Sequence, residues 1–330
     1  CGPQLAYERG SDRTTGTDAV LAAIQRSLAR GEIVAIKGLG GYHLACDASS
    51  PDAVALLRAR KRRGDKPFAV LVADLDEARR LGRVDAAVVD ALSSPRAPIV
   101  LVPSAPVDAQ AMQVVRSAAP GIGDIGLLLP YSPLHHLIVR EHPALPGTAP
   151  LRVVILTSGN LSDEPICTEE AEADERLSGL ADALLHHDRP IHVACDDSVV
   201  RVVGGRLQPV RRSRGFAPLP LRLPSPVAPT LAVGGELKTA VCLARGERAW
   251  MSQHIGDTEN LETLAMLERT VGTLAELASV RPERIVADAH PGYLSRRWAG
   301  EHATALGVPL VLVQHHHAHL ASLLAEHLVP

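Results

Sequence analysis

Four histidines lie within five positions, directly after an apolar run, in the stretch VLVQHHHAHLAS (residues 311–322). His315 and His319 are four residues apart, so on a helix they project from nearly the same face. Paired imidazoles at this spacing occur in metal sites, and their nitrogens suit Zn²⁺ or Fe²⁺. A helix start that uses histidine incidentally would give the same pattern, so the spacing alone leaves both interpretations open.

A basic run, RARKRRGDK (residues 58–66), offers a different chemistry, because six of its nine residues are cationic. A second basic cluster, RLQPVRRSR, follows at residues 206–214. Since the whole chain has a net charge of −3, the two clusters indicate a local anion-binding site rather than a surface for nucleic acid. The alternative is a solvated helix end, where cations complement the helix dipole.

Two short loops are candidates for holding such an anion. LTSGNLSDEP (156–165) follows the apolar run LRVVI, and small hydroxyl and amide side chains with a glycine after a strand suit a phosphate. KGLGGYHLACD (37–47) has three glycines that permit a close backbone approach to a ligand, and His43 lies in this turn. Open α/β sheets bind ligands at such strand ends. Ordinary turn chemistry would explain the first loop equally well.

The elements that would position these residues alternate between helices and strands. Residues 17–30 carry one apolar helical stripe behind Thr17, the predicted N-cap. Apolar runs such as PFAVLVA and APIVLV read as buried strands, and further helices are predicted at 132–141 and 168–178. This alternation predicts an α/β fold, and two strands joined by the Gly204–Gly205 turn make its sheet mixed.

A proline-rich stretch, APLPLRLPSPVAPT (217–230), separates this region from a second one. It is expected to be an extended spacer without regular structure. Beyond it, helices are predicted at 258–278, at 292–305 and from 316 onward, with strands between them. The domain boundary is therefore placed at this stretch.

Composition sets the cellular context. The 330 residues, 46% of them hydrophobic, are enough for two domains. No apolar run is long enough for a membrane span, and no signal peptide opens the chain. The five cysteines lie far apart without a C-x-x-C pair, which indicates a reducing compartment and a cytoplasmic protein. The chain starts without Met and stops as a helix begins, which we interpret as a fragment of a longer protein.

The basic run and the hydroxyl loop together resemble a known family. Lys61-Arg62-Arg63 with Lys66-Pro67 resembles the K-x-R motif, and Ser158-Gly159-Asn160 the S-x-N motif, of the YrdC/TsaC family. Asp197-Ser198-Val199 and Arg214-Gly215 fit the same pattern. The wider stretches KGLGGYHLACDA, RKRRGDKPFAV and RRSRGFAP resemble one branch, the HypF-type carbamoyltransferases of hydrogenase maturation. VGGELKTAVCL, DAHPGYLSRRWA and VQHHHAHLAS resemble the TsaD-like domain of that branch, a member of the actin/sugar-kinase-like superfamily.

The resemblance implies how the chain is divided. Residues 1–13 would be the remnant of a zinc-finger region, and residues 14–216 a YrdC-like ATP-binding domain with a mixed twisted sheet and flanking helices. Residues 217–230 would be the linker. Residues 231–330 would be the N-terminal lobe of a truncated TsaD-like carbamoyltransferase domain with an α/β fold.

The resemblance also implies roles for individual residues. Lys61, Arg63 and Lys66 would supply cations for the phosphates and the carbamoyl oxygen. The nucleotide would be bound by Lys37, His43, Thr157, Ser158, Asn160, Ser198 and Arg214. His315 and His319 would bind Zn²⁺ or Fe²⁺ in the longer protein, whose remaining part would complete that site.

The implied reaction has two steps. The YrdC-like domain would convert carbamoyl phosphate and ATP, with Mg²⁺, into carbamoyl-adenylate and pyrophosphate. The TsaD-like domain would then pass the carbamoyl group to the C-terminal cysteine thiolate of a HypE-type acceptor, for the cyanide ligand of NiFe-hydrogenase. The fragment would keep only the first step, and neither a membrane nor a nucleic acid is expected as a partner.

Three other functions compete with this one. An antibiotic-type O-carbamoyltransferase would place its TsaD-like part first, whereas here the YrdC-like motifs come first. A stand-alone threonylcarbamoyl-adenylate synthase would lack the attached second region. An RNA-binding module would use the two basic clusters, and its binding would be sensitive to salt.

Overall fold

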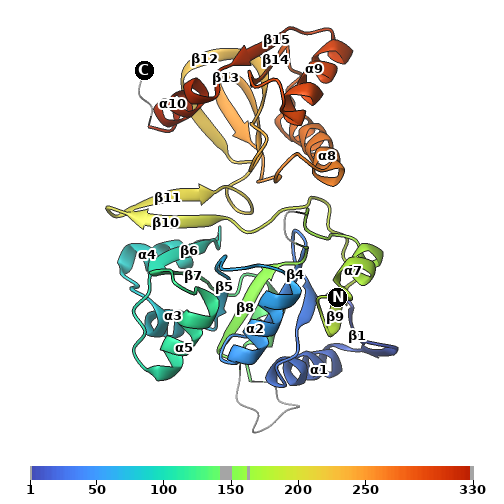
Figure 1. Ribbon diagram of the computed structural model, residues 1–330, viewed down its shortest axis with the longest axis vertical. Helices are drawn as coiled ribbons and strands as arrows, with labels where there is room; N and C mark the ends of the chain where they lie inside the picture. Colours follow the sequence, from blue (N-terminus) through green and yellow to red (C-terminus); the bar gives the residue numbers. More distant parts are fainter. Residues whose placement is uncertain (1, 142–150, 162–163, 328–330) are drawn as a thin grey trace. The chain divides into compact units, whose positions relative to one another are not determined.

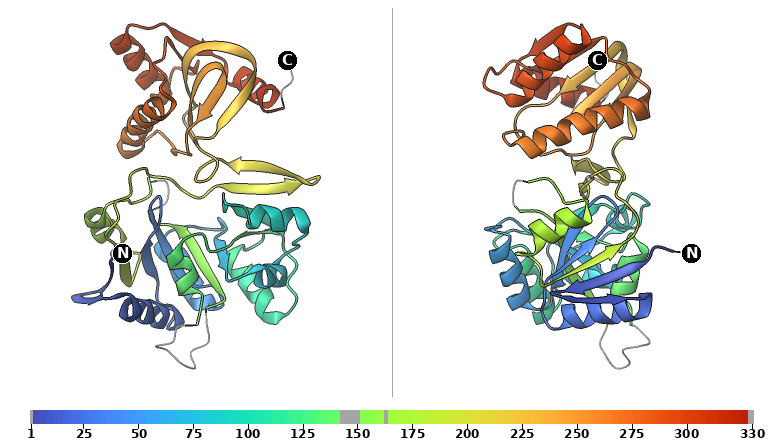
Figure 2. Two further views of the ribbon diagram at one scale, coloured as in Figure 1. Left: turned by 180° about the vertical axis from the view of Figure 1, so that it is seen from behind. Right: turned by 90° about the vertical axis from the view of Figure 1, so that its right-hand side faces the viewer.

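The computed structural model describes residues 2–141, 151–161 and 164–327. Contacts divide the chain into two compact units. The first ends at Arg211, and the second consists of the residues from Arg212 onward together with a short segment that includes Glu164 and Pro165. Figure 1 shows the two units in the colours of the sequence, and Figure 2 shows them from two further sides. Each unit has its own sheet. None of the helices in the described ranges is long and apolar enough to cross a lipid bilayer.

The first unit is built on a mixed sheet that, over the described residues, has eleven strands in the order β11-β10-β6-β7-β5-β8-β4-β3-β9-β1-β2. Its strands are β1 (Leu5–Arg9), β2 (Asp12–Thr15), β3 (Val34–Lys37), β4 (Tyr42–Asp47), β5 (Ala69–Val72), β6 (Ile99–Pro103), β7 (Asp124–Leu128), β8 (Val153–Ser158), β9 (Ala183–His187), β10 (Val199–Val203) and β11 (Arg206–Arg211). Its helices are α1 (Thr17–Ala29), α2 (Pro51–Arg60), α3 (Leu75–Leu81), α4 (Ala86–Leu92), α5 (Ala109–Ala118), α6 (Pro133–Ile138) and α7 (Glu170–Leu177). β3 and β9, β5 and β7, and β6 and β10 pair in parallel, whereas β4 pairs with both of its neighbours in antiparallel fashion. The prediction of a mixed sheet is therefore confirmed.

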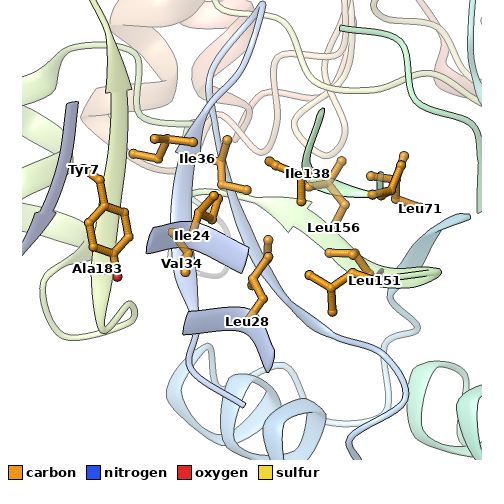
Figure 3. Close-up of a cluster of buried hydrophobic side chains, with 14 of the residues drawn as sticks. Tyr7, Ile24, Leu28, Val34, Ile36, Leu71, Ile138, Leu151, Leu156 and Ala183 are labelled. Carbon is orange, nitrogen blue, oxygen red and sulfur yellow. The ribbon is translucent and has the colours of Figure 1, made fainter. Parts of the chain in front are cut away.

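An apolar core holds α1 against this sheet (Figure 3). The stripe predicted for the helix is confirmed, because Val20, Ile24 and Leu28 are fully buried. They lie in one cluster with strand residues such as Val34 and Leu156. Burying each of these side chains contributes about 1.5–3 kcal/mol, so the helix is fixed by packing rather than by its ends.

The N-cap predicted for the first helix is wrong, and the segment before it forms strands. α1 begins at Thr17, but its N-cap is Gly16, whose φ of 87° favours glycine, and no side chain caps the helix. β1 pairs in antiparallel fashion with both β2 and β9. Residues 5–9 and 12–15 therefore belong to the sheet of the first unit, which satisfies their backbone groups.

The connection between β9 and β10 brings distant residues together. β9 lies beside β3, whereas β10 lies beside β6, so residues 188–198 run from one part of the sheet to another. On the way, the backbone N–H of Cys195 donates to the carbonyl oxygen of Gly40, at 2.8 Å, in the turn between β3 and β4. A Cβ at position 40 would lie 2.2 Å from the Cys195 carbonyl oxygen, so this approach requires glycine.

The described strands of the second unit form a four-stranded sheet in the order β13-β12-β14-β15. They are β12 (Pro220–Val233), β13 (Val241–Met251), β14 (Arg284–Asp288) and β15 (Leu310–Val313), and the helices are α8 (Leu261–Ala278), α9 (Leu294–Leu306) and α10 (His315–Glu326). β12 and β13 are antiparallel, and β14 and β15 run parallel to β12. α8 packs against β13 and α9 against β14, as the alternation of predicted helices and strands requires.

The prediction that prolines would keep residues 217–230 free of regular structure is wrong, because β12 begins at Pro220. Proline has no N–H to donate, so a strand tolerates it where pairing is interrupted. The register of β12 with β13 shifts twice between Arg222 and Thr230, and the later prolines fall within that stretch. The segment is extended, as expected, but it is part of the sheet of the second unit.

Candidate functional site

Lys61 is a buried cation that follows the last residue of α2. The helix starts behind Ser50, whose side chain accepts a hydrogen bond from the N–H of Ala53, and it ends at Arg60. Lys61 is only 1% exposed. Its Nζ atom donates to the carbonyl oxygens of Ser158 and Asn160, at 2.7 and 2.6 Å, and to Oδ1 of Asn160, at 2.7 Å. We refer to Lys61, Ser158 and Asn160 as the lysine site.

The loop after β8 supplies the oxygens of the lysine site. The hydroxyl of Ser158 donates to Oδ1 of Asn160 at 2.7 Å, so the serine and the lysine share one acceptor. The backbone N–H of Gly159 donates to the carbonyl oxygen of Tyr42 at 2.6 Å. A Cβ at position 159 would lie 2.7 Å from that oxygen, so the loop closes onto β4 only because glycine is present. Thr157 pairs with Leu44 in the same ladder.

His43 lies on β4 directly opposite Ser158 of β8. It is 4% exposed, and its Nε2 atom is 3.3 Å from Oδ2 of Asp197. Within the described part of the chain, its buried Nδ1 atom has no hydrogen-bond partner. Ser198 is fully buried, and its carbonyl oxygen accepts a hydrogen bond from the N–H of Ile99 at 2.8 Å. The connection to β10 thus delivers both Asp197 and Ser198 to this region.

Lys37 is also buried, but its contacts lie elsewhere. Its Nζ atom donates to Oε1 of Glu170 at 2.8 Å and to the carbonyl oxygen of His187 at 2.9 Å. The hydrogen bond from Lys37 is the main cause that lowers the pKa of Glu170. The ammonium group therefore fixes α7 to the ends of β3 and β9, and the structure does not bring it to the lysine site through any hydrogen bond of the described residues.

The two other predicted cations of the basic run differ from Lys61. Arg63 donates through Nε and Nη2 to the carbonyl oxygen of Pro67, at 3.2 and 2.8 Å, and its guanidinium lies 4.8 Å from the centre of the Phe68 ring. Burial, together with the charges of neighbouring arginines, lowers the pKa of Arg63 to about 10. The side chain of Lys66 is exposed. Arg214, predicted to bind the nucleotide, belongs to the second unit.

The histidine pair, His315 and His319, opens α10 in the second unit. The two Nε2 atoms face each other at 3.0 Å. Nδ1 of His315 is 2.7 Å from Oδ2 of Asp288, which ends β14. Burial alone would raise the pKa of Asp288, but hydrogen bonds from the N–H of His290 and from His315 outweigh it and lower that pKa. Spacing predicted the convergence of the two rings, and the fold adds the carboxylate that orients one of them.

Comparison with known proteins identifies both regions. A family model for Sua5, YciO and YrdC proteins, described as telomere recombination, matches residues 26–213. The chain belongs to the Sua5–YciO–YrdC family. A second family model, described as the HypF Kae1-like domain, matches residues 225–326.

Individual relatives cover nearly the whole chain. Carbamoyltransferase HypF2 of Cupriavidus necator is 45% identical over 94% of this chain and 39% of its own length. Carbamoyltransferase HypF of Rhodobacter capsulatus is 44% identical over 100% of this chain and 42% of its own length. A crystal structure of full-length HypF in the phosphate- and nucleotide-bound form matches with a TM-score of 0.87 and 37% identity, over 99% of this chain and 41% of that one. The predicted resemblance and the fold it implied are confirmed, and the chain spans about two fifths of the length of these relatives.

In this HypF homologue the histidine pair has the chemistry of a partial metal site. Two imidazole nitrogens converge, and Asp288 holds one ring through its other nitrogen, as carboxylates do for metal-bound histidines. Zn²⁺ and Fe²⁺ both accept such nitrogens. Among the described residues, however, no third histidine, cysteine or carboxylate is grouped with the pair. The residues present fit two positions of a coordination sphere and leave the others to further ligands.

Asp197 and Asp288 are the polar neighbours for which no spacing rule gives a signal. Asp197 meets His43 across the connection from β9 to β10, and Asp288 meets His315 across two parallel strands. Their positions follow from strand order rather than from local periodicity. The sequence signal for both is the family resemblance, since Asp197 lies in the stretch Asp197-Ser198-Val199 and Asp288 opens the stretch DAHPGYLSRRWA.

Proposed function

We propose that the first unit binds ATP and carbamoyl phosphate and forms carbamoyl-adenylate, as the ATP-dependent half of a carbamoyltransferase. The lysine site carries this proposal, because it joins a buried cation to the hydroxyl and amide loop that suits a nucleotide. The relatives are named carbamoyltransferases, and a solved HypF is described as phosphate- and nucleotide-bound, which supports the same substrates.

The proposed chemistry depends on charge and position. Water would first hydrolyse carbamoyl phosphate to carbamate and inorganic phosphate. An oxygen of the carbamate would then attack the α-phosphorus of ATP. One P–O bond forms, the bond to the β-phosphate breaks, and pyrophosphate leaves with the electron pair. Mg²⁺ enters with the ATP and neutralises phosphate charge. The protein's task is to hold the two reactants in line and to stabilise the charge on the phosphates.

Lys61 is the cation best placed for that task. Its ammonium group is already desolvated and aimed at the loop by three oxygen atoms, so little reorganisation is needed when a phosphate oxygen arrives. We assign Oδ1 of Asn160 as the acceptor that gives way, because it belongs to a side chain whereas the other two are backbone carbonyls. Arg63 and Lys66, farther along the same run, would meet the more distant phosphates.

Neutral hydrogen bonds would hold the rest of the nucleotide. Ser158 and Asn160 provide a hydroxyl and an amide at the end of β8, with Thr157 beside them and Ser198 at the start of β10. His43 lies opposite Ser158 and would contact the bound substrate from β4. In this proposal Lys37 supports the site through α7.

We further propose that the longer protein completes a carbamoyl transfer. The second unit, with Zn²⁺ or Fe²⁺ at the histidine pair, would pass the carbamoyl group to the C-terminal cysteine thiolate of a HypE-type acceptor, in the cytoplasm. Shielding the adenylate from water on its route is chemically sensible, because carbamoyl-adenylate hydrolyses readily. With only about two fifths of the relatives' length, the present chain would perform the first step alone.

The test is exchange of labelled pyrophosphate into ATP by this chain, with and without carbamoyl phosphate. We expect exchange that depends on carbamoyl phosphate, and a loss of about a hundredfold in Lys61→Met, since removing one preorganised charge-stabilising group costs about that much. Lys238→Met, an exposed lysine of the second unit, is the control and should keep full exchange. Exchange that Lys61→Met leaves unchanged would reject the site. Exchange that requires threonine and bicarbonate instead would reject the substrate and favour a threonylcarbamoyl-adenylate synthase.

A further inference from the structure

A buried histidine of the first unit faces two carboxylates that come from other elements. His186 lies in β9, Glu8 in β1 and Asp174 in α7. Nε2 of His186 is 3.7 Å from Oε2 of Glu8 and 3.6 Å from Oδ1 of Asp174. One candidate ligand atom from each of the three residues lies within 4.8 Å of the others. None of the three belongs to the proposed nucleotide site or to a motif that the sequence singled out.

Among the three residues, the His186 side chain gives the strongest indication of a bound ligand. The His186 side chain is only 6% exposed, and its Nδ1 atom is 2.7 Å from the hydroxyl of Tyr42. Among the residues that the structure describes, Nε2 makes no hydrogen bond, because both carboxylate oxygens are too far away. A ring that is held at one nitrogen by a buried neighbour, and presents the other to two carboxylates, has the arrangement of a metal-binding histidine.

We propose that Glu8, Asp174 and His186 bind a first-row divalent transition-metal ion, for which Zn²⁺ is the probe. One imidazole and two carboxylates form a ligand set that Zn²⁺ accepts, with a fourth position for water. Tetrahedral ligands at Zn²⁺ bond lengths are roughly 3.3 Å apart, so the contacts of His186 need to shorten by only a few tenths of an ångström. The Asp174 side chain is 52% exposed, so it can move toward the ring. Glu8 pairs with Arg13 through Oε1, at 3.3 Å, and presents its other oxygen, Oε2, to His186.

The ion would join parts of the first unit that are far apart in the sequence. Glu8 belongs to the first strand, whereas Asp174 belongs to a helix that Lys37 also contacts through Glu170. Tyr42, which holds His186, is the residue whose carbonyl oxygen receives the N–H of Gly159. Metal binding would therefore stabilise the packing of β1, of α7 and of the strand that supports the loop after β8. The resulting gain in the free energy of unfolding would grow with metal concentration.

The competing interpretation is that His186 only forms ion pairs with the two carboxylates, without any metal. Only the metal site predicts that Zn²⁺ affinity depends on the carboxylates. The two are separated by Zn²⁺ titration calorimetry on the whole chain carrying His315→Asn and His319→Asn. These two changes remove the exposed histidine pair, so binding that remains comes from elsewhere.

In that background we expect one Zn²⁺ per chain, and an affinity at least about tenfold weaker after Asp174→Asn or Glu8→Gln. Glu175→Gln changes the adjacent exposed acid of α7 and should keep the affinity. Thermal unfolding with and without Zn²⁺ provides the second readout, with a rise of the midpoint in the control and a smaller rise in Asp174→Asn. No binding, or equal affinity in all three variants, would overturn the proposal.

Discussion

The lysine site and the histidine pair place polar groups in opposite ways. Lys61 is 1% exposed, and its ammonium contacts residues almost a hundred positions away in the sequence. The side chain of His315 is 55% exposed, and α10 has no buried residue among those described. His315 meets its partner His319 one helical turn away. The first arrangement is held by the fold, whereas the second is held by one helix and one carboxylate.

This difference in burial predicts that Lys61 affects the stability of the fold, whereas the histidine pair affects only metal binding. A buried cation that satisfies several oxygens is part of the folded structure, so its removal should lower the free energy of unfolding. An exposed histidine pair contributes little to folding, so its loss should matter only when a metal is present. The two units can be followed separately, because both tryptophans, Trp250 and Trp298, lie in the second unit.

Lys61→Met should have the largest effect on stability. The change keeps the length of the side chain but removes the donor from two carbonyl oxygens and one amide oxygen, so we expect the free energy of unfolding of the first unit to fall by about 3 kcal/mol. Hydrogen exchange of the β8 amides measures this loss, and the tryptophan fluorescence transition of the second unit should not move. Lys66→Met, at an exposed position, should change the same amides by less than about 0.5 kcal/mol. Equal effects of the two substitutions would mean that the buried contacts do not support the fold.

Asp182→Asn should have a smaller effect that depends on pH. Asp182 accepts hydrogen bonds from Nη2 of Arg60, at 2.8 Å, and from the N–H of Ile33, at 2.9 Å. Burial opposes these contacts, but they prevail and lower the pKa of Asp182 below its usual value. A lowered folded-state pKa means that the carboxylate adds its full stability above its ordinary pKa of about 3.9. That stability is lost as the pH falls below this value and through the lower pKa of the folded state.

We therefore expect Asp182→Asn to cost about 1 kcal/mol at pH 7, and the difference from the parent to shrink between pH 5 and pH 2. Urea unfolding at several pH values, followed by hydrogen exchange in the first unit, provides the measurement. Asp90→Asn, at an exposed position of α4, should show no such trend. A difference that grows as the pH falls would contradict the assigned role of Arg60.

Ser158→Ala tests how the loop of the lysine site is held. The Ser158 hydroxyl and the Lys61 ammonium both donate to Oδ1 of Asn160. In Ser158→Ala the hydrogen bond from Lys61 to this oxygen remains. We expect a loss of about 1 kcal/mol in the free energy of unfolding, together with weaker ATP binding in calorimetry. Ser94→Ala, whose hydroxyl donates to the carbonyl of Ala91, is a matched control that should lose stability but not ATP affinity. Unchanged ATP affinity in Ser158→Ala would separate the loop from the nucleotide.

Local periodicity accounts for what the sequence predicted well. The stripe of α1 and the His315–His319 spacing both lie within single helices, where 3.6 residues per turn fixes which side chains are neighbours. The contacts of Lys61 with Ser158 and of His43 with Asp197 depend on which strands pair, and no periodicity encodes the order of the sheet. The family resemblance predicted that the motif around Lys61 and the motif around Ser158 act together. Only the packed structure shows that the Lys37 ammonium is bound to Glu170.

The histidine pair should show the smallest effect on stability and still bind a metal. In an Asp174→Asn background, we expect His315→Asn with His319→Asn to change the tryptophan-detected free energy of unfolding by less than about 0.5 kcal/mol, because these side chains are exposed. Zn²⁺ affinity should nevertheless fall at least about tenfold, and Asp288→Asn should weaken it by about 10–100-fold, because the carboxylate orients His315. His316→Asn with His317→Asn makes the same chemical change at the two exposed neighbours and should preserve binding. If both double substitutions lowered the Zn²⁺ affinity equally, the affinity would depend only on the number of histidines in this segment. The convergence of the two Nε2 atoms would then have no role in metal binding.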